Sequence, residues 1–182
     1  MESVVSLSAQ NAGFTLIELM IVITVLAVFV VVGVPNFQNL VSDNRLSTQT
    51  NLLVSSLQLA RSEALKLRTP VSVCRSTDGA TCAGTGAWES GWLVFVDGGA
   101  LGDVDGADTV INTVGTLSAG NTLRGNAGVN NFISYQPTGL QNTGNGDFRL
   151  CDGNNPDIAK GRTISISATG RVSSGVSVTA CP

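Results

Sequence analysis

The sequence predicts an α+β fold, in which a long N-terminal helix packs on an antiparallel β-sandwich-like head. Three observations predict it: an unbroken apolar run over residues 14–34, a helical stripe that follows it to about residue 67, and short glycine-bounded β-like runs beyond residue 70. With 182 residues, the chain suffices for one compact domain plus a long helix, but not for two well-filled domains. We therefore expect one head on one stalk.

The apolar run reads FTLIELMIVITVLAVFVVVGV and is long enough to cross a bilayer core as a helix, which takes about 20 residues. It is longer than the apolar core of a usual secretory signal, no small-residue cleavage site follows it, and it contains Glu18. A carboxylate at membrane depth costs about 2.5–3.5 kcal/mol on insertion scales, so Glu18 needs a partner or a function. A plain signal anchor with a glutamate near the interface is the alternative.

The helix is expected to continue beyond the apolar run and to become amphipathic. Because a proline inside a helix removes one hydrogen bond, we expect a bend at Pro35. A stripe then recurs at spacings of three and four residues: Leu46, Thr50, Leu53, Leu57, Ala60, Ala64 and Leu67. This pattern predicts a helix laid on a sheet. A coiled-coil seam is the weaker alternative, because the stripe spans about three heptads and includes small and polar members.

After Pro70 the pattern changes to short strands bounded by Gly, Asn, Asp or Pro. Seven antiparallel strands are predicted, over residues 71–74, 91–96, 109–111, 131–135, 147–151, 163–166 and 175–178. The large aromatic side chains Trp88, Trp92 and Phe95 suit a half-buried pleated surface, and we expect them in the core.

Composition argues against several classes of function. The chain has no histidine, which removes the commonest general base and metal ligand, and no glycine-rich phosphate loop follows a strand, so no enzyme is indicated. The net charge of −3 and the scattered basic residues do not point to nucleic acid. Four cysteines lie outside the apolar run, as expected in an oxidising compartment, although buried reduced thiols are an alternative.

The residues around the start of the apolar run resemble a known processing site. The string GFTLIE over residues 13–18 is similar to the site in type IV prepilins and type II secretion pseudopilins. The resemblance implies that an inner-membrane prepilin peptidase cuts between Gly13 and Phe14, removes a leader of residues 1–13 and N-methylates Phe14. It also implies an assembly role for Glu18, whose carboxylate would neutralise the α-amino group of a neighbouring subunit. The leader has no lysine or arginine, unlike most such leaders.

Further motifs resemble the GspH/FimT family of minor pilins and pseudopilins over nearly the whole chain. They are RSEA at 61–64, VSVC at 71–74, Trp88, GWLVFVD at 91–97 and TGRV at 169–172. The resemblance implies a pilin-like fold, with residues 14–41 in the membrane or filament core and residues 42–182 as a periplasmic head. It implies a low-abundance type IV pilus subunit that primes assembly or sits near the tip, in pilus biogenesis, twitching motility and adhesion.

The same resemblance leaves two other functions open: a type II secretion pseudopilin, and a DNA-binding competence pilin. In each case the expected partners are the prepilin peptidase, an inner-membrane assembly platform and other pilins, both minor and major. The expected location is the inner membrane, crossed once, and then the extracellular filament.

The four cysteines permit three pairings, of which we expect Cys74 with Cys82 and Cys151 with Cys181. The first disulfide would close a short loop and the second would pin the C-terminal strand to an interior one. By the loop-entropy model each would contribute about 2–4 kcal/mol.

Four aspartates, Asp97, Asp103, Asp105 and Asp108, fall in the segment DGGALGDVDGAD. Carboxylates at alternate positions can converge on a hard cation, so calcium is one hypothesis. A full EF-hand pattern is missing, and Asp-Gly pairs also form ordinary turns, so a solvated turn without any cofactor is the favoured interpretation.

Two arginines follow glycines, Arg162 and Arg171. In DNA-uptake members of the FimT family a C-terminal Gly-Arg-x-Arg motif contacts DNA, but Ser173 occupies the second arginine position here. Because non-specific affinity depends on the number of phosphates neutralised, this loss predicts weak binding. Lys160, Arg162 and Arg171 are the candidate DNA contacts, and exposed arginines at strand ends are the alternative.

Overall fold

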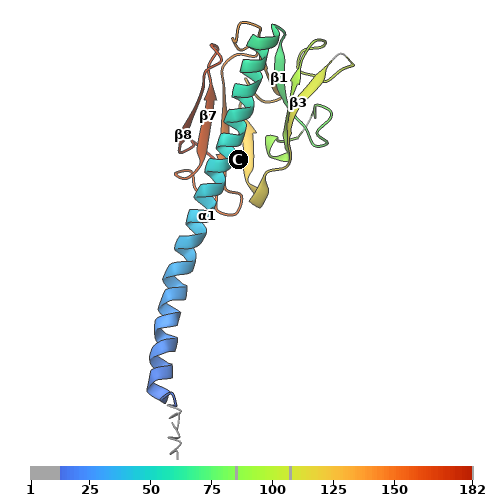
Figure 1. Cartoon of the computed structure of the whole chain (residues 1–182). Helices are drawn as coiled ribbons and strands as arrows, with labels where there is room; N and C mark the ends of the chain where they lie inside the picture. The colour runs from blue at the N-terminus through green and yellow to red at the C-terminus, as the bar shows by residue number, and fades with distance from the viewer. Residues whose placement is uncertain (1–12, 85, 107, 182) are drawn as a thin grey trace, which may run out of the picture. The chain divides into compact units, whose positions relative to one another are not determined.

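The computed structural model describes residues 13–84, 86–106 and 108–181 (Figure 1). The chain divides into two units, residues 1–41 and residues 42–182. The helices among the described residues are α1 (Leu16–Leu67) and two short 3₁₀ helices, η1 (Trp88–Ser90) and η2 (Ser118–Gly120). The strands are β1 (Val71–Arg75), β2 (Trp92–Val96), β3 (Thr109–Val114), β4 (Thr122–Gly125), β5 (Phe132–Tyr135), β6 (Gly146–Cys151), β7 (Arg162–Ile166) and β8 (Val172–Val176).

Helix α1 runs through Pro35 without interruption. Directly after Pro35, the side-chain amide of Asn36 donates to the carbonyl oxygen of Val32 at 2.8 Å and is therefore bonded to its own helix. Such local bonding keeps the amide from facing an apolar environment unpaired.

The strands of the head form two antiparallel sheets. We call β3-β2-β1-β5 sheet A and β4-β6-β7-β8 sheet B, each in its spatial order. This arrangement confirms the predicted α+β fold, with a long helix packed on antiparallel sheets.

The strand prediction was wrong in two places. Strand β4 was not predicted, because its short sequence TLRG carries little β signal. The last strand lies at Val172–Val176 rather than at 175–178, because Gly170, with φ of 76°, makes a turn that brings Val172 opposite Ile166.

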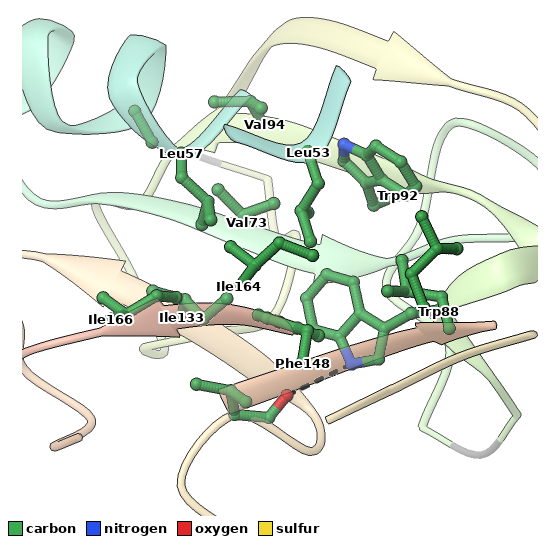
Figure 2. Close-up of a cluster of buried hydrophobic side chains, with 14 of the residues drawn as sticks. Leu53, Leu57, Val73, Trp88, Trp92, Val94, Ile133, Phe148, Ile164 and Ile166 are labelled. Carbon is green, nitrogen blue, oxygen red and sulfur yellow. Dashed lines mark hydrogen bonds between the residues drawn. The ribbon is translucent and has the colours of Figure 1, made fainter. Parts of the chain in front are cut away.

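The main core of the head lies between α1 and the inner faces of the two sheets. Figure 2 shows the helix contributing Leu53 and Leu57, sheet A Val73, Val94 and Ile133, and sheet B Phe148, Ile164 and Ile166. The predicted stripe is confirmed except at its end, since Leu67 is 43% exposed. The apolar spacing of the helix thus decides which of its faces is buried.

The two tryptophans anchor this core through their polar as well as their apolar atoms. Trp88 packs edge-on against Phe148 with ring centroids 5.0 Å apart, and its Nε1 donates to the carbonyl oxygen of Val129 at 3.1 Å. Nε1 of Trp92 donates to Oγ of Ser56 on α1 at 3.0 Å. Burial of Trp88 and Trp92 confirms the predicted core role, because each ring finds its hydrogen-bond partner inside the head.

Sheet A is covered on both faces. Leu93 and Phe95 alternate with Trp92 and Val94 along β2, and they join Cys74 in a second apolar cluster on the other face of the sheet. This cluster explains why every residue of β1 is buried, and it confirms the predicted burial of Phe95.

Candidate functional site

The predicted processing site lies where α1 begins. Gly13 and Phe14 precede the helix, and Phe14 is 83% exposed. Oγ1 of Thr15 accepts a hydrogen bond from the backbone N–H of Glu18 at 3.3 Å. This is the side-chain half of a capping box, in which a threonine bonds the amide three residues later. The Gly13–Phe14 bond therefore lies just outside a capped helix, on backbone that belongs to no helix or strand.

Sequence reasoning missed this role of Thr15. The signal that could have found it is the Thr-x-x-Glu spacing directly before an apolar run. The cap gives Thr15 a structural role beside the role expected for Glu18, since it satisfies one of the unpaired amides at the helix start.

The first part of α1 has no protein partner for its apolar surface. Every large apolar side chain of residues 14–40 is between 48% and 83% exposed. The helix is long and apolar enough to cross a membrane, with a mean hydropathy of 2.9 in its most apolar window. Glu18 is the only charged residue over 14–42. Such a segment is stable only when lipid or other apolar helices cover it.

The predicted DNA contacts are not brought together. Arg162 shares the inner face of β7 with Ile164, and its guanidinium donates to the carbonyl oxygen of Lys160 and, at 3.5 Å, to Oγ of Ser47 on α1. Arg171 lies just before β8, at the opposite end of the β7–β8 hairpin, and on the outer face. Two arginines on opposite faces of one sheet do not make one patch for a phosphate backbone.

The predicted calcium residues bond mainly to their own loop. Asp97 accepts from the hydroxyl of Ser72 and the backbone amide of Gly102, Asp105 from the amide of Ala100, and Asp108 from the amides of Gly98 and Asp105. Within the described residues, Asp103 and these three carboxylates belong to no group of three or more side chains that could hold a metal ion. Turn formation therefore accounts for the aspartates that make these bonds.

Asp97 differs from the other aspartates of this loop because it is buried, with 2% of its surface exposed. Its Oδ1 makes no hydrogen bond within the described part of the chain. Burial raises the pKa of this carboxyl above its ordinary value, although the bonds from Ser72 and Gly102 act in the opposite direction.

The structure contains two disulfides, Cys74–Cys82 and Cys151–Cys181, which is the pairing expected from the sequence. The first closes the loop after β1, which Asp78 caps by accepting from the backbone amides of Ala80 and Thr81 at 2.9 Å each. These bonds lower the pKa of Asp78. The second disulfide ties β6 to the C-terminal segment.

Comparison with known proteins bears on both units. A family model described as type II transport protein GspH matches residues 49–170, and a model of the prokaryotic N-terminal methylation motif matches residues 8–34. No curated protein sequence matches the chain.

Two crystal structures of the type IV minor pilin FimU from Pseudomonas aeruginosa have a similar fold. The first has a TM-score of 0.61 at 22% identity and covers 76% of this chain and 96% of that chain. The second has a TM-score of 0.57 at 20% identity and covers 75% and 99%. At this identity the likeness concerns the fold, and it agrees with the family match. The chain therefore belongs to the GspH family, whose members are pilins and pseudopilins, and it carries the N-terminal methylation motif.

Proposed function

We propose that this chain is a minor pilin of a type IV pilus, inserted in the inner membrane and then incorporated into the filament through its N-terminal helix. The observation that carries the proposal is the exposed apolar segment of residues 14–40, which begins with the methylation motif and belongs to a chain with a GspH-family head. An apolar helix of this length is needed both in a bilayer and in a filament core, where neighbouring helices replace lipid.

The division of roles follows the residues. Residues 1–13 are the leader, which lies outside the described residues except for Gly13. Residues 14–41 hold the subunit in the membrane or filament core, and residues 42–182 form the periplasmic head, whose two disulfides suit an oxidising compartment. The partners are the prepilin peptidase, the assembly platform and other pilins. The head contributes recognition and packing, not catalysis.

Glu18 is the residue on which assembly depends. Its carboxylate is the one charge in the apolar segment, and pairing with the terminal amine of a neighbouring subunit removes the cost of leaving it unpaired. The alternative, a type II secretion pseudopilin, is supported by the description of the matching family model as a type II transport protein. The fold of FimU, a type IV minor pilin, favours the pilus.

Two variants test the proposal. Glu18→Val is expected to give a processed, membrane-resident protein that is absent from sheared filaments, because only the intersubunit charge pairing is lost. Gly13→Leu is expected to remain unprocessed, because the peptidase requires a minimal residue before the cut. Intact-mass spectrometry of membrane fractions reports cleavage and methylation, and immunoblots of filament and membrane fractions report incorporation.

Thr24→Val is the matched control for Glu18→Val, since it changes another polar side chain of the same exposed helix, one that bonds only to its own backbone at Ile21. It should be processed and incorporated like the wild type. Incorporation of Glu18→Val at the wild-type level would refute the assembly role. Recovery of the subunit only with a type II secretion apparatus, and never in pili, would favour the pseudopilin.

A further inference from the structure

The outer face of sheet B carries a regular grid of polar side chains. Asp147 on β6 lies opposite Ser165 on β7, which lies opposite Ser173 on β8. Side chains directly opposite each other on one face of an antiparallel sheet stand about 5 Å apart. These three residues therefore form one row across three strands.

A second polar row lies two residues further along the same strands. It consists of the residue before β6, the residue after β7 and the residue before β8: Asn145, Ser167 and Arg171. Because residues two apart in a strand point to the same face, both rows share the outer face. The backbone N–H of Ser167 donates to the carbonyl oxygen of Arg171 at 3.0 Å, which keeps the strands paired at this level.

The two rows line a hollow of about 490 Å³ that is open to solvent, and Asn126 borders it beside Asp147. The lining contains no aromatic ring, and its only large apolar side chain is that of Ile166, which is itself buried in the core. The hollow is thus a hydrogen-bonding surface and not an apolar pocket.

Most of these side chains are available to a ligand. Within the described residues, the hydroxyls of Ser165 and Ser173, the amide of Asn145 and the guanidinium of Arg171 make no hydrogen bond to another protein group. The exceptions are the Ser167 hydroxyl, which is engaged with Thr169 and the backbone of Arg171, and the Asp147 carboxylate, which accepts from the side-chain amide of Asn126 at 3.5 Å. Ligand groups could therefore bind most of these side chains without breaking bonds inside the head.

The two charges of the hollow lie at opposite corners. With strands about 4.8 Å apart and about 3.4 Å per residue, the backbones of Asp147 and Arg171 are roughly 12 Å from each other. They form no ion pair in the described structure. A ligand with a carboxylate at one end and hydroxyls at the other can meet the guanidinium and the carboxylate at once.

A polyanion fits this surface less well. A phosphate backbone laid across the three strands would bring negative charge to Asp147, and the hollow offers only one arginine to neutralise it. Sugars that carry a carboxylate match the donors and acceptors better, because each hydroxyl both donates and accepts.

We propose that this hollow binds acidic glycans of the uronic acid type, with Arg171 on the sugar carboxylate and Ser165, Ser173 and Asp147 on its hydroxyls. The site goes beyond the minor-pilin function and does not depend on it, since it would operate on any exposed head. The sequence alone suggests DNA as the ligand of Arg171. This proposal assigns it an acidic glycan instead.

The experiment uses the full processed chain in detergent micelles and a galacturonic acid trisaccharide as the probe. Saturable binding is expected by calorimetry or ligand-observed NMR, and the neutral galactose trisaccharide should bind at least about tenfold more weakly, because it lacks the charge-assisted bonds to Arg171. Arg171→Gln should weaken binding of the acidic trisaccharide by about tenfold. Ser165→Ala should weaken it by a smaller factor, because it removes only the hydroxyl.

Arg149→Gln is the matched control, because Arg149 is on the same strand as Asp147, two residues along, and does not line the hollow. It removes the same charge and should leave binding of the acidic trisaccharide within about twofold of wild type. Thermal unfolding of each variant checks the fold, and Arg171→Gln alters only an exposed side chain.

Three results would overturn the proposal. They are an absence of saturable binding of the acidic trisaccharide, equal losses in Arg171→Gln and Arg149→Gln, and duplex DNA that binds more tightly than the trisaccharide and displaces it. Equal losses would indicate general attraction to the arginines of the head. Displacement by DNA would indicate a nucleic-acid surface.

Discussion

Residues 16–41 and residues 42–67 belong to one uninterrupted helix, yet the two parts differ in the exposure of their apolar side chains. In the first part, Leu26 is 58% exposed, as are the other large apolar side chains around it to a similar degree. In the second part, Leu53 and Leu57 are completely buried between two sheets. The same residue type is thus exposed in one part, where it is free to contact lipid or other helices, and supports folding of the head in the other.

The hydrogen bonds of the polar side chains also differ between the two parts. In residues 16–41 the side chains of Thr24 and Asn36 bond to their own helix backbone. In residues 42–67 Ser47, Thr48, Ser55 and Ser62 also bond to their own helix, but other side chains reach the head. Arg61 donates to the carbonyl oxygens of Gly139 at 3.0 Å and Thr169 at 3.1 Å. A helix that lies in lipid must satisfy its polar groups internally, whereas a helix packed on a head can also form hydrogen bonds to the head with them.

Truncating one leucine in each part tests most directly whether the two parts differ in their contribution to the stability of the head. Leu53→Ala is expected to reduce the free energy of unfolding of the head by about 2–5 kcal/mol, because it leaves a cavity in a packed core. Leu26→Ala is expected to change it by less than about 0.5 kcal/mol, because the side chain is 58% exposed and alanine favours the helix.

Urea unfolding of both variants in detergent, followed by tryptophan fluorescence, makes the measurement, since Trp88 and Trp92 report on the core of the head. Equal destabilisation by the two substitutions would show that the two parts of the helix do not differ as described.

The disulfides sharpen the comparison, because both lie in the head. In the chain-entropy model, a loop of 30 residues gives about 3.6 kcal/mol and a loop of 8 residues about 2.5 kcal/mol. Replacing Cys151 and Cys181 by alanine should therefore cost about 1 kcal/mol more than replacing Cys74 and Cys82. Denaturant titration of the two double variants measures this difference, and a larger cost for the shorter loop would contradict the entropic account.

Much of the fold could be predicted from the sequence because its signals are periodic. Spacings of three and four residues identified Leu46, Leu53 and Leu57 as buried, and a short β-like run bounded by turn residues indicated β2. Strand β4 was not predicted, because its burial depends on contacts with η1 and β6 that no local sequence pattern encodes.

The candidate site was only partly predictable. Gly13, Phe14 and Glu18 stand out because they interrupt or precede an apolar run, so one segment of sequence is enough to find them. The hollow around Arg171 depends on strand register, which places residues from three separate segments side by side. Serines and asparagines that are ordinary turn and strand residues in the sequence become a candidate site only through that register.

The smallest expected effect concerns the pH dependence of the stability of the head, to which the buried Asp97 contributes. Because burial raises the pKa of Asp97 above its ordinary value of 3.8, the folded head binds this proton more tightly than the unfolded chain. The resulting stabilisation is fully present below pH 3.8 and is lost as the pH rises through the pKa of the folded state. Other carboxyls, such as Asp78 with its lowered pKa, act in the opposite direction, so the contribution of Asp97 is isolated by substitution.

Asp97→Asn keeps an oxygen that can accept from Ser72 and Gly102 but cannot ionise. The variant should therefore unfold at a higher temperature than the wild type near pH 7, by about 2–4 °C, and the two melting temperatures should converge as the pH falls toward 3.8. Asp147→Asn is the matched control for removing one negative charge, because this exposed aspartate lies outside the buried loop. Thermal unfolding in detergent between pH 3.5 and pH 7, read by circular dichroism at about ten pH values, gives both curves. A constant difference between wild type and Asp97→Asn across that range would show that the ionisation of Asp97 does not affect the stability of the head.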